Sequence, residues 1–460
     1  MKHAPLAGLA LAAFVVRFLH LSSSAEPTGW DGYSYVVQLE RLASEGRLHW
    51  PDASWVFWFL AALHVVIPSV VVAIKLGSCV LAALVVPAAW RLGGPTLAVW
   101  AACSPTLTHL AGDFPKNLGV VAPLLLVLAW RRGDSRAVLV IAAALAALAH
   151  RTGAALLLAV ALGVIIGTLA SRTRPARIAV ALVLGTLAFA ALSVVLPGLL
   201  HPADLERVGG QLDFTAHVPP PWPYFALRET SWVQKLELLL AWPALVVGVH
   251  RFVVRPDARV RTAALVLPLV VCLFPLWRTD SLDLGYRLSL LAPMFAFPLL
   301  LDPERFEFQA PWLLALPLVL VGRTGFDAKT SNPPYAEWRA LIARIPRPLP
   351  KLLIAPQGLN FLYDHETGNE SMAWAPQPEL DRRDVYRLAW DVSDGEWAEL
   401  IGGDEPQPTR LGPNVVYVRE DVWERFRLRA LEVDDDDLHA RVSSAKNPSR
   451  VRPASLMRAR

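Results

Sequence analysis

Long apolar runs separated by short polar loops make up most of residues 1–322. A helix needs about 20 apolar residues to cross about 30 Å of hydrocarbon, and shorter runs are extended by their flanks. The pattern predicts a polytopic α-helical membrane protein. Its eleven expected spans are Ala4–Leu21, Val70–Trp90, Leu97–Ala111, Leu118–Trp130, Ala137–Ala149, Gly153–Ala170, Ala176–Leu196, Leu236–Val249, Thr262–Leu276, Leu288–Leu301 and Ala310–Val321.

Loop arginines decide how the further apolar segment Trp55–Ile67 is placed. With eleven spans and a cytoplasmic N-terminus, the arginine clusters at 131–136, 172–177 and 251–261 all lie in the cytoplasm, as the positive-inside rule requires. A twelfth span at Trp55–Ile67 would move them outside. We therefore interpret this segment as a juxtamembrane or half-inserted helix.

The N-terminal apolar run also fits a signal peptide cleaved near Ala25. Arg17 inside the run and the many later spans favour an uncleaved first helix.

The first external loop, residues 22–69, contains a short amphipathic pattern that follows Asp31. Its apolar positions are Tyr35, Val36, Leu39, Leu42 and Ala43, whereas Gln38, Arg41 and Glu45 occupy the opposite face. The spacing predicts a helix that ends at Gly46. Between two spans, such a helix would lie on the bilayer surface and hold Asp31 at the lipid–water boundary.

Many ionisable residues at span ends fall on the external side of this topology. Charges close to hydrocarbon are costly unless they pair or line a wet cavity, so this distribution predicts a polar cavity that opens outward. The set is Asp31, Asp113, Lys116, His150, Arg151, Arg228, Glu229, Arg278, Asp280, Asp283 and Arg287.

Composition changes after the last span. The composition of residues 323–430 predicts a small external α/β domain. Its expected strands are Lys351–Ala355 and Asn414–Arg419, and its expected helices lie around Gly358–His365 and Asp421–Leu428. Residues 431–460 begin with an acidic run and lack an apolar period, so we expect a disordered tail. The proline-rich loop Pro197–Lys235 is either a cover for a lipid-facing groove or a plain interfacial loop.

The chain has 54% hydrophobic residues and a mean hydropathy of +0.39, which excludes an ordinary soluble enzyme. Its net charge of +4 comes from loop arginines that act as topology signals, so no nucleic-acid partner is expected. The three cysteines lie in apolar runs, and neither a disulfide framework nor zinc spacing is present.

The order of motifs in roughly the first 130 residues resembles the GT-C superfamily of membrane glycosyltransferases, which use polyprenyl-phosphate-linked sugars. The likeness comprises Arg17 in the first span, Asp31 with Tyr33 and Tyr35, the helix that ends at Gly46, and GDFPKN at Gly112–Asn117. Many members begin this loop with two acidic residues, whereas Gly32 follows Asp31 here. We therefore assign no metal ligand, and a need for a divalent metal is not predicted.

The resemblance implies transfer of a sugar to a glycan, lipid or protein acceptor during glycan biosynthesis in the cell envelope. The enzyme would be a multi-pass protein of the plasma (inner) membrane with its active site on the external, periplasmic face.

Such a reaction needs a carboxylate that deprotonates the acceptor hydroxyl. Asp31 is the candidate general base, and its alternative role is the N-cap of the following helix. Asp113 and Lys116 are candidates for positioning the acceptor or contacting the phosphate, or else they form a local ion pair around Pro115. His150 and Arg151 fit an interfacial snorkelling pair or a phosphate contact.

A leaving phosphate needs cations that stay charged in a low-dielectric site, which favours arginine. Arg287 is the first choice, because the superfamily often has an arginine in a comparable late position. Arg228 and Arg278 are further candidates. Arg17 is expected to snorkel or to partner Asp31.

Two other functional classes stay open. A lipid or glycan transporter would need broken helices in matching halves, for which Pro123, Pro268 and Pro293 are indications. A non-catalytic assembly subunit would use the external domain for contacts.

The arginine distribution makes the topology testable. Cysteine accessibility or reporter fusions should place the loops at 131–136 and 251–261 in the cytoplasm and residue 400 outside. A cytoplasmic signal from residue 400 would contradict the eleven-span arrangement.

Overall fold

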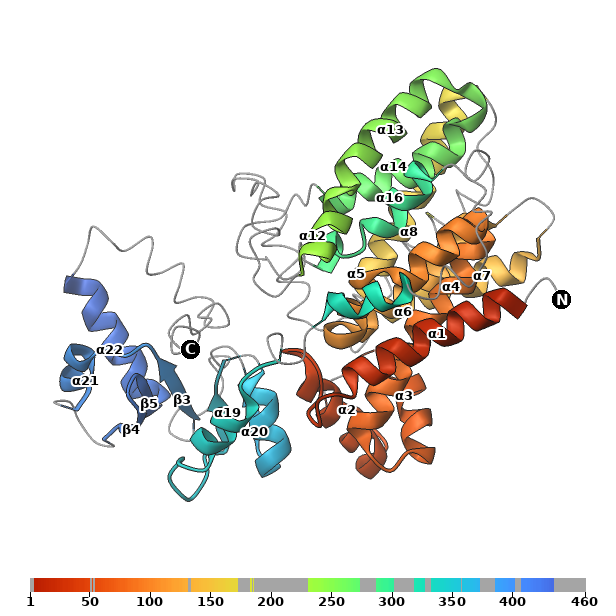
Figure 1. Ribbon diagram of the computed structural model, residues 1–460. Helices are drawn as coiled ribbons and strands as arrows, with labels where there is room; N and C mark the ends of the chain where they lie inside the picture. Colours follow the sequence, from red (N-terminus) through yellow and green to blue (C-terminus); the bar gives the residue numbers. More distant parts are fainter. Residues whose placement is uncertain are drawn as a thin grey trace. The chain divides into compact units, whose positions relative to one another are not determined.

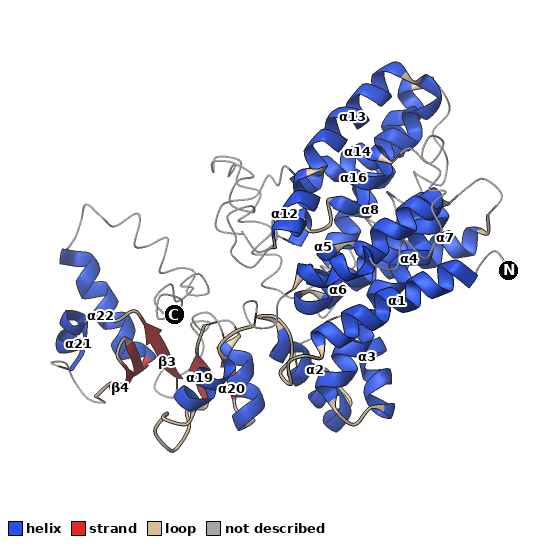
Figure 2. Ribbon diagram, in the orientation of Figure 1, coloured by secondary structure: helices blue, strands red, loops and turns tan. Residues whose placement is uncertain are grey.

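The computed structural model describes residues 4–49, 52, 54–130, 134–172, 183, 185, 231–273, 287–301, 318–326, 332–356, 358–372, 385–401 and 407–433. Contacts divide the chain into two units. The first unit comprises residues 1–29 and 38–331, and the second comprises residues 30–37 and 332–460. Helices dominate the described elements, and a small sheet lies in the second unit (Figure 2).

The helices of the first unit are apolar and pack in pairs, with α1 along α4, α4 along α6 and α8 along α14 (Figure 1). They are α1 (Ala4–Leu21), α3 (Trp55–Val66), α4 (Val70–Cys103), α5 (Pro105–Asp113), α6 (Pro115–Ala129), α7 (Arg136–Ala149), α8 (Arg151–Ala170), α12 (Trp232–Leu239), α13 (Ala241–Val254), α14 (Arg259–Leu273) and α16 (Pro293–Leu300), with the short 3₁₀ helices η1 (Pro256–Ala258) and η3 (Leu320–Gly325).

Four helical stretches in the described part of the chain are long and apolar enough to cross a membrane: Ala4–Leu21, Val70–Cys103, Arg151–Ala170 and Trp232–Val254. Shorter apolar helices include α3, α6 and α7. The predicted span Ala176–Leu196 lies outside the described residues, apart from two isolated positions, as do residues 197–230 and most of Ala310–Val321. A count of eleven therefore stays a prediction.

The predicted span Leu97–Ala111 is wrong as a single helix. Helix α4 runs from Val70 to Cys103, with non-helical backbone at Gly93 and Gly94, and α5 begins at Pro105. Ser104 is extended, with φ −62° and ψ 116°, because the proline ring disfavours helical backbone in the preceding residue. Proline then fits the first position of α5, where no amide hydrogen is required.

Buried polar side chains stabilise the break at Ser104 through hydrogen bonds. Glu237 of α12 accepts hydrogen bonds from the indole of Trp100 at 2.9 Å, from the Ser104 hydroxyl at 2.6 Å, and from the amide and hydroxyl of Thr106. One carboxylate thereby connects the end of α4, the start of α5 and α12.

Arg17 supports the same break from α1. It is fully buried, and it donates to the carbonyls of Ala101 and Ser104 at 3.0 and 3.1 Å and to the hydroxyl of Thr108 at 2.8 Å. The expectation that Arg17 snorkels is therefore wrong. Its positive charge lies at the C-terminal end of α4, where the helix dipole favours a cation.

Close backbone contact joins α8 to α14. A Cβ atom at Gly163 would lie 2.3 Å from the carbonyl oxygen of Ala263, and one at Gly167 would lie 2.5 Å from the Cα atom of Val260. Glycines four residues apart let membrane helices approach in this way.

Helix α2 (Gly32–Glu45) follows Asp31, and Gly46 after it has φ +71°. Both predicted ends are therefore confirmed. Gln38, expected on the polar face, is instead buried beside Val36 and Leu39, whereas Ala43 is exposed. The buried surface is thus wider near the start of the helix than the pattern predicts.

The second unit is built on a five-stranded mixed sheet with strand order β2-β1-β3-β5-β4. Strand β1 pairs in parallel with β2 and β3, whereas β5 is antiparallel to β3 and β4. The elements are α19 (Tyr335–Ile342), β1 (Leu352–Ile354), α20 (Leu359–Thr367), β2 (Glu370–Met372), β3 (Val385–Trp390), α21 (Asp394–Ile401), β4 (Thr409–Gly412), β5 (Val415–Arg419) and α22 (Glu420–Val433).

The two predicted strands and two predicted helices of this region correspond to β1, β5, α20 and α22. They are confirmed as elements. Strands β2, β3 and β4 were not predicted. The tail after residue 433 lies outside the described residues.

Candidate active site

The turn between α5 and α6 brings a carboxylate against the loop that follows α1. Asp113, the last residue of α5, is 6% exposed, and its Oδ2 lies 4.0 Å from Nε2 of His109. A Cβ atom at Gly29 would lie 2.1 Å from Oδ1 of Asp113. Gly29 also has φ +78°, so the position favours glycine through both space and backbone conformation.

Arg287 lies beside this turn. The residue is 8% exposed, and its guanidinium is 4.5 Å from the ring centroid of Phe114, which separates α5 from α6. An aromatic face attracts a cation, so the Phe114 ring fixes the position of the guanidinium.

Lys116, in the first turn of α6, is held from the first loop. Its Nζ donates to Oδ2 of Asp52 at 2.8 Å and lies 5.2 Å from the ring centroid of Phe57. The ion pair links α6 to the residues just before α3. Lys116 therefore occupies a fixed place in the first unit.

His150 caps α8, so the interpretation as a snorkelling side chain is wrong. Its Nδ1 accepts a hydrogen bond from the amide of Thr152 at 3.2 Å and lies 2.9 Å from the Thr152 hydroxyl. Asn117 of α6 donates to that hydroxyl at 3.1 Å. Since Nδ1 accepts from the amide, the neutral ring carries its proton on Nε2.

Three cations act on the His150 ring. Burial is the largest cause that lowers the pKa of His150 well below its usual value, and the charges of Arg151, Lys116 and Arg287 lower it further. These cations come from α8, α6 and the segment before α16. The neutral imidazole therefore marks a place where positive charge from three separate segments converges.

Asp31 belongs to the second unit by its contacts. Its carbonyl accepts hydrogen bonds from the amide and hydroxyl of Ser34 at 2.9 and 2.6 Å, so its backbone is fixed at the start of α2. The side chain is half-buried. This backbone geometry is that of an N-cap residue.

The remaining predicted site residues are Arg17, Arg228 and Arg278. Arg228 and Arg278 lie outside the described residues, as do Glu229, Asp280 and Asp283. Arg17 braces the α4–α5 break and is away from solvent. In the described part of the chain, no group of three or more His, Cys, Asp and Glu side chains is arranged to hold a metal ion.

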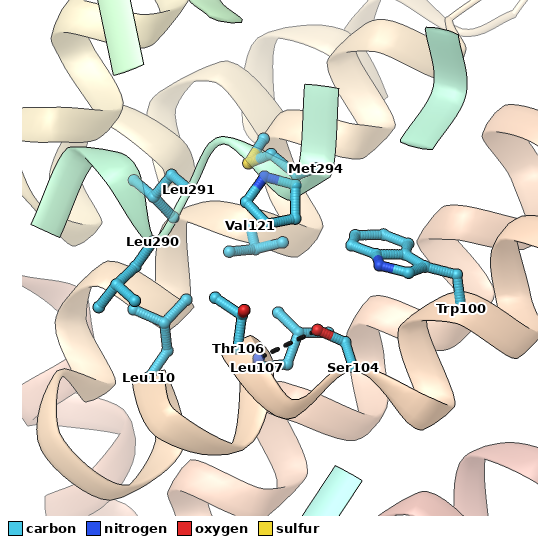
Figure 3. Close-up of a pocket in the computed structure, with 10 residues that line it drawn as sticks. Trp100, Ser104, Thr106, Leu107, Leu110, Val121, Leu290, Leu291 and Met294 are labelled. Carbon is cyan, nitrogen blue, oxygen red and sulfur yellow. Dashed lines mark hydrogen bonds between the residues drawn. The ribbon is translucent and has the colours of Figure 1, made fainter. Parts of the chain in front are cut away.

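A small cavity adjoins the α4–α5 break (Figure 3). Its volume is about 10 Å³, and its lining includes Trp100, Thr106, Leu290 and Met294. One water needs about this much space, so the cavity cannot hold a sugar. It belongs to the packing between α5 and the start of α16.

Sequence reasoning missed three residues that shape this region. Glu237 is a lone acid in an apolar run, and such a residue signals a buried partner set. Asn117 ends the GDFPKN motif, but the sequence assigned no role to it or to Thr152. Their importance comes from hydrogen bonds between helices.

No protein-family model matches the chain, and no curated protein matches it. Among solved structures, the chain is similar to ArnT from Cupriavidus metallidurans bound to undecaprenyl phosphate, with 13% identity and a TM-score of 0.45, over 91% of this chain and 98% of that chain. It is also similar to ArnT from the same organism in the apo state, with 13% identity and a TM-score of 0.41, over 89% and 96% of the two chains.

The contact of Gly29 with Asp113 has a matched control in Gly46. Both glycines have positive φ, but nothing lies within 4 Å of a Cβ atom at Gly46. Each alanine variant bears the backbone strain, of about 1–2 kcal/mol, and Gly29→Ala adds overpacking of about 1–3 kcal/mol. Gly29→Ala should therefore melt at a lower temperature than Gly46→Ala in detergent. Equal melting temperatures would contradict the contact.

Proposed function

We propose that this chain is a membrane glycosyltransferase that moves a sugar from a polyprenyl-phosphate-linked donor to a glycan, lipid or protein acceptor at the external face of the membrane. The observation that carries the proposal is a group of cations around the α5–α6 turn, where Arg287 lies against the Phe114 ring and Lys116 follows in the first turn of α6. A lipid-linked phosphate is an anion that must be bound at membrane level, and this cluster supplies the opposite charge there.

Arg287 is the proposed main phosphate contact. Its guanidinium donates through a planar fork that matches two phosphate oxygens, and the Phe114 ring holds it in place. Lys116 adds a point charge, while the Nε2 proton of the neutral His150 ring adds a hydrogen-bond donor. Together they stabilise the charge that develops on the leaving phosphate.

Asp31 is the proposed general base. In the transfer, the acceptor oxygen forms a bond to the anomeric carbon of the sugar as the bond from that carbon to the phosphate oxygen breaks. The acceptor proton passes to the carboxylate of Asp31, and the bonding electrons leave with polyprenyl phosphate. Asp113 is proposed to position the acceptor, since it is nearly buried next to the first loop.

A transporter is the second candidate, because α4 contains non-helical backbone at Gly93 and Gly94 and ends at the Ser104 break. Transporters place such breaks around substrates. At Ser104, however, the freed groups bond to Glu237 and Arg17, and the adjoining cavity of about 10 Å³ holds no more than water. Transfer of sugar is therefore the proposal that we favour.

The reaction is tested by assaying membranes or purified protein with radiolabelled polyprenyl-phosphate sugars. Asp31→Asn keeps the size and much of the capping capacity of the side chain but removes the proton acceptor. Transfer should fall by about 10² or more, with the melting temperature nearly unchanged. The control is Asp257→Asn, which changes an exposed carboxylate in η1.

Two outcomes would contradict this assignment. A fully active Asp31→Asn protein would remove Asp31 as the base, and a parallel loss of activity and melting temperature would indicate a structural cap.

A further inference from the structure

Residues 30–37, which contain Asp31, group with the C-terminal unit although about 300 residues of chain separate them. Trp30 meets Trp338 edge to face at 5.6 Å between ring centroids, and Tyr33 meets Tyr335 at 5.0 Å. Tyr33, Tyr335 and Trp338 are each less than 5% exposed. This segment is therefore packed as a part of the second unit.

A chain of polar contacts fixes Tyr33 from two helices of that unit. Arg339 of α19 donates through Nη2 to the Tyr33 hydroxyl and through Nε to Oε1 of Glu366 at 2.6 Å. The His365 ring of α20 lies 5.1 Å from the Tyr33 ring. Because the hydroxyl bond is directional, it sets the orientation of Tyr33 in a way that ring packing alone does not.

The backbone just before Asp31 also packs against the second unit. A Cβ atom at Gly358 would lie 3.1 Å from the Trp338 ring and 3.2 Å from the carbonyl oxygen of Trp30. Gly358 has φ +89°, which also favours glycine. The loop that leads into α20 thus approaches the backbone immediately before Asp31, while Tyr33 anchors the backbone just after it.

We infer that Tyr33 and Arg339 are positioning residues for the carboxylate of Asp31. This inference rests on the proposed role of Asp31 as the base. A base must lie within hydrogen-bond reach of the acceptor proton, and small displacements of a reacting group reduce rates steeply. Neither Tyr33 nor Arg339 touches the reacting atoms.

The test is a double-mutant cycle in the full-length protein in detergent. Tyr33→Phe removes only the hydroxyl, and Arg339→Gln removes its charged partner. Each single change should lower kcat about tenfold and leave the donor KM within about twofold. Since both changes remove the same hydrogen bond between Arg339 and Tyr33, the double variant should be no slower than the slower single variant.

Arg410→Gln is the matched control. Arg410 donates to Asp394 at 2.7 Å in the same unit, and its other described contacts are with Pro413 and Trp397. Its kcat should equal that of the wild type. Hydrogen exchange of the amides at 32–37 should accelerate in Tyr33→Phe and Arg339→Gln, but not in Arg410→Gln.

Three results would overturn positioning: an unchanged kcat in both single variants, losses that multiply in the double variant, or a rise in KM with kcat unchanged. Asp31→Asn separates this failure from failure of the proposed function. If Asp31→Asn is inactive while the kcat values of Tyr33→Phe and Arg339→Gln are normal, only the positioning role is contradicted. If Asp31→Asn is fully active, Asp31 is not the base, and the positioning role is contradicted as well. In that case, hydrogen exchange of the amides at 32–37 still shows whether the contact between Tyr33 and Arg339 exists.

Discussion

The carboxylate of Glu237 is the interaction on which the arrangement of the site depends. It collects donors from the end of α4 and the start of α5, while Arg17 satisfies carbonyls at the same break. A broken helix at membrane depth leaves backbone groups without helical partners, and in hydrocarbon each such group costs several kcal/mol unless protein satisfies it. Because the break fixes the start of α5, it also helps to fix the position of this helix, which carries Asp113 at its other end. The phosphate-binding proposal therefore depends on a network that itself touches no substrate.

Around the α5–α6 turn, the fold places two cationic side chains together with a neutral histidine. Arg287 and Lys116 are placed by aromatic rings and by Asp52, whereas His150 stays neutral because burial and the neighbouring cations oppose its protonation. Its hydrogen bond with the Thr152 amide then fixes which ring nitrogen is a donor. An anion that enters the cluster meets cations and a donor, rather than a further titrating group whose charge changes near neutral pH.

Local patterns in the sequence were sufficient to predict α1, α7, α8, both ends of α2 and the strands β1 and β5. Apolar periodicity and turn residues encode these elements directly. The break at Ser104 also had a local signal, the Ser-Pro pair, which a continuous apolar run concealed. By contrast, the environments of Arg17, Glu237 and His150 depend on residues from other helices, and no single segment encodes them. The same holds for residues 30–37, whose partners on α19 and α20 come about 300 positions later. The number of spans and the roles of Arg228 and Arg278 stay predictions from the sequence.

Binding of the lipid phosphate tests the role of Arg287 without requiring the sugar or the acceptor to be known. The melting temperature of the purified protein should be measured with a polyprenyl monophosphate and with the matching polyprenol, for the wild type and for Arg287→Gln. A ligand that binds only the folded state raises stability with its concentration, so the phosphate should raise the melting temperature of the wild type well above the effect of the polyprenol. In Arg287→Gln, most of that difference should disappear. Equal shifts from the phosphate and the alcohol in the wild-type protein would show that the cationic cluster does not bind the phosphate, and would contradict the account.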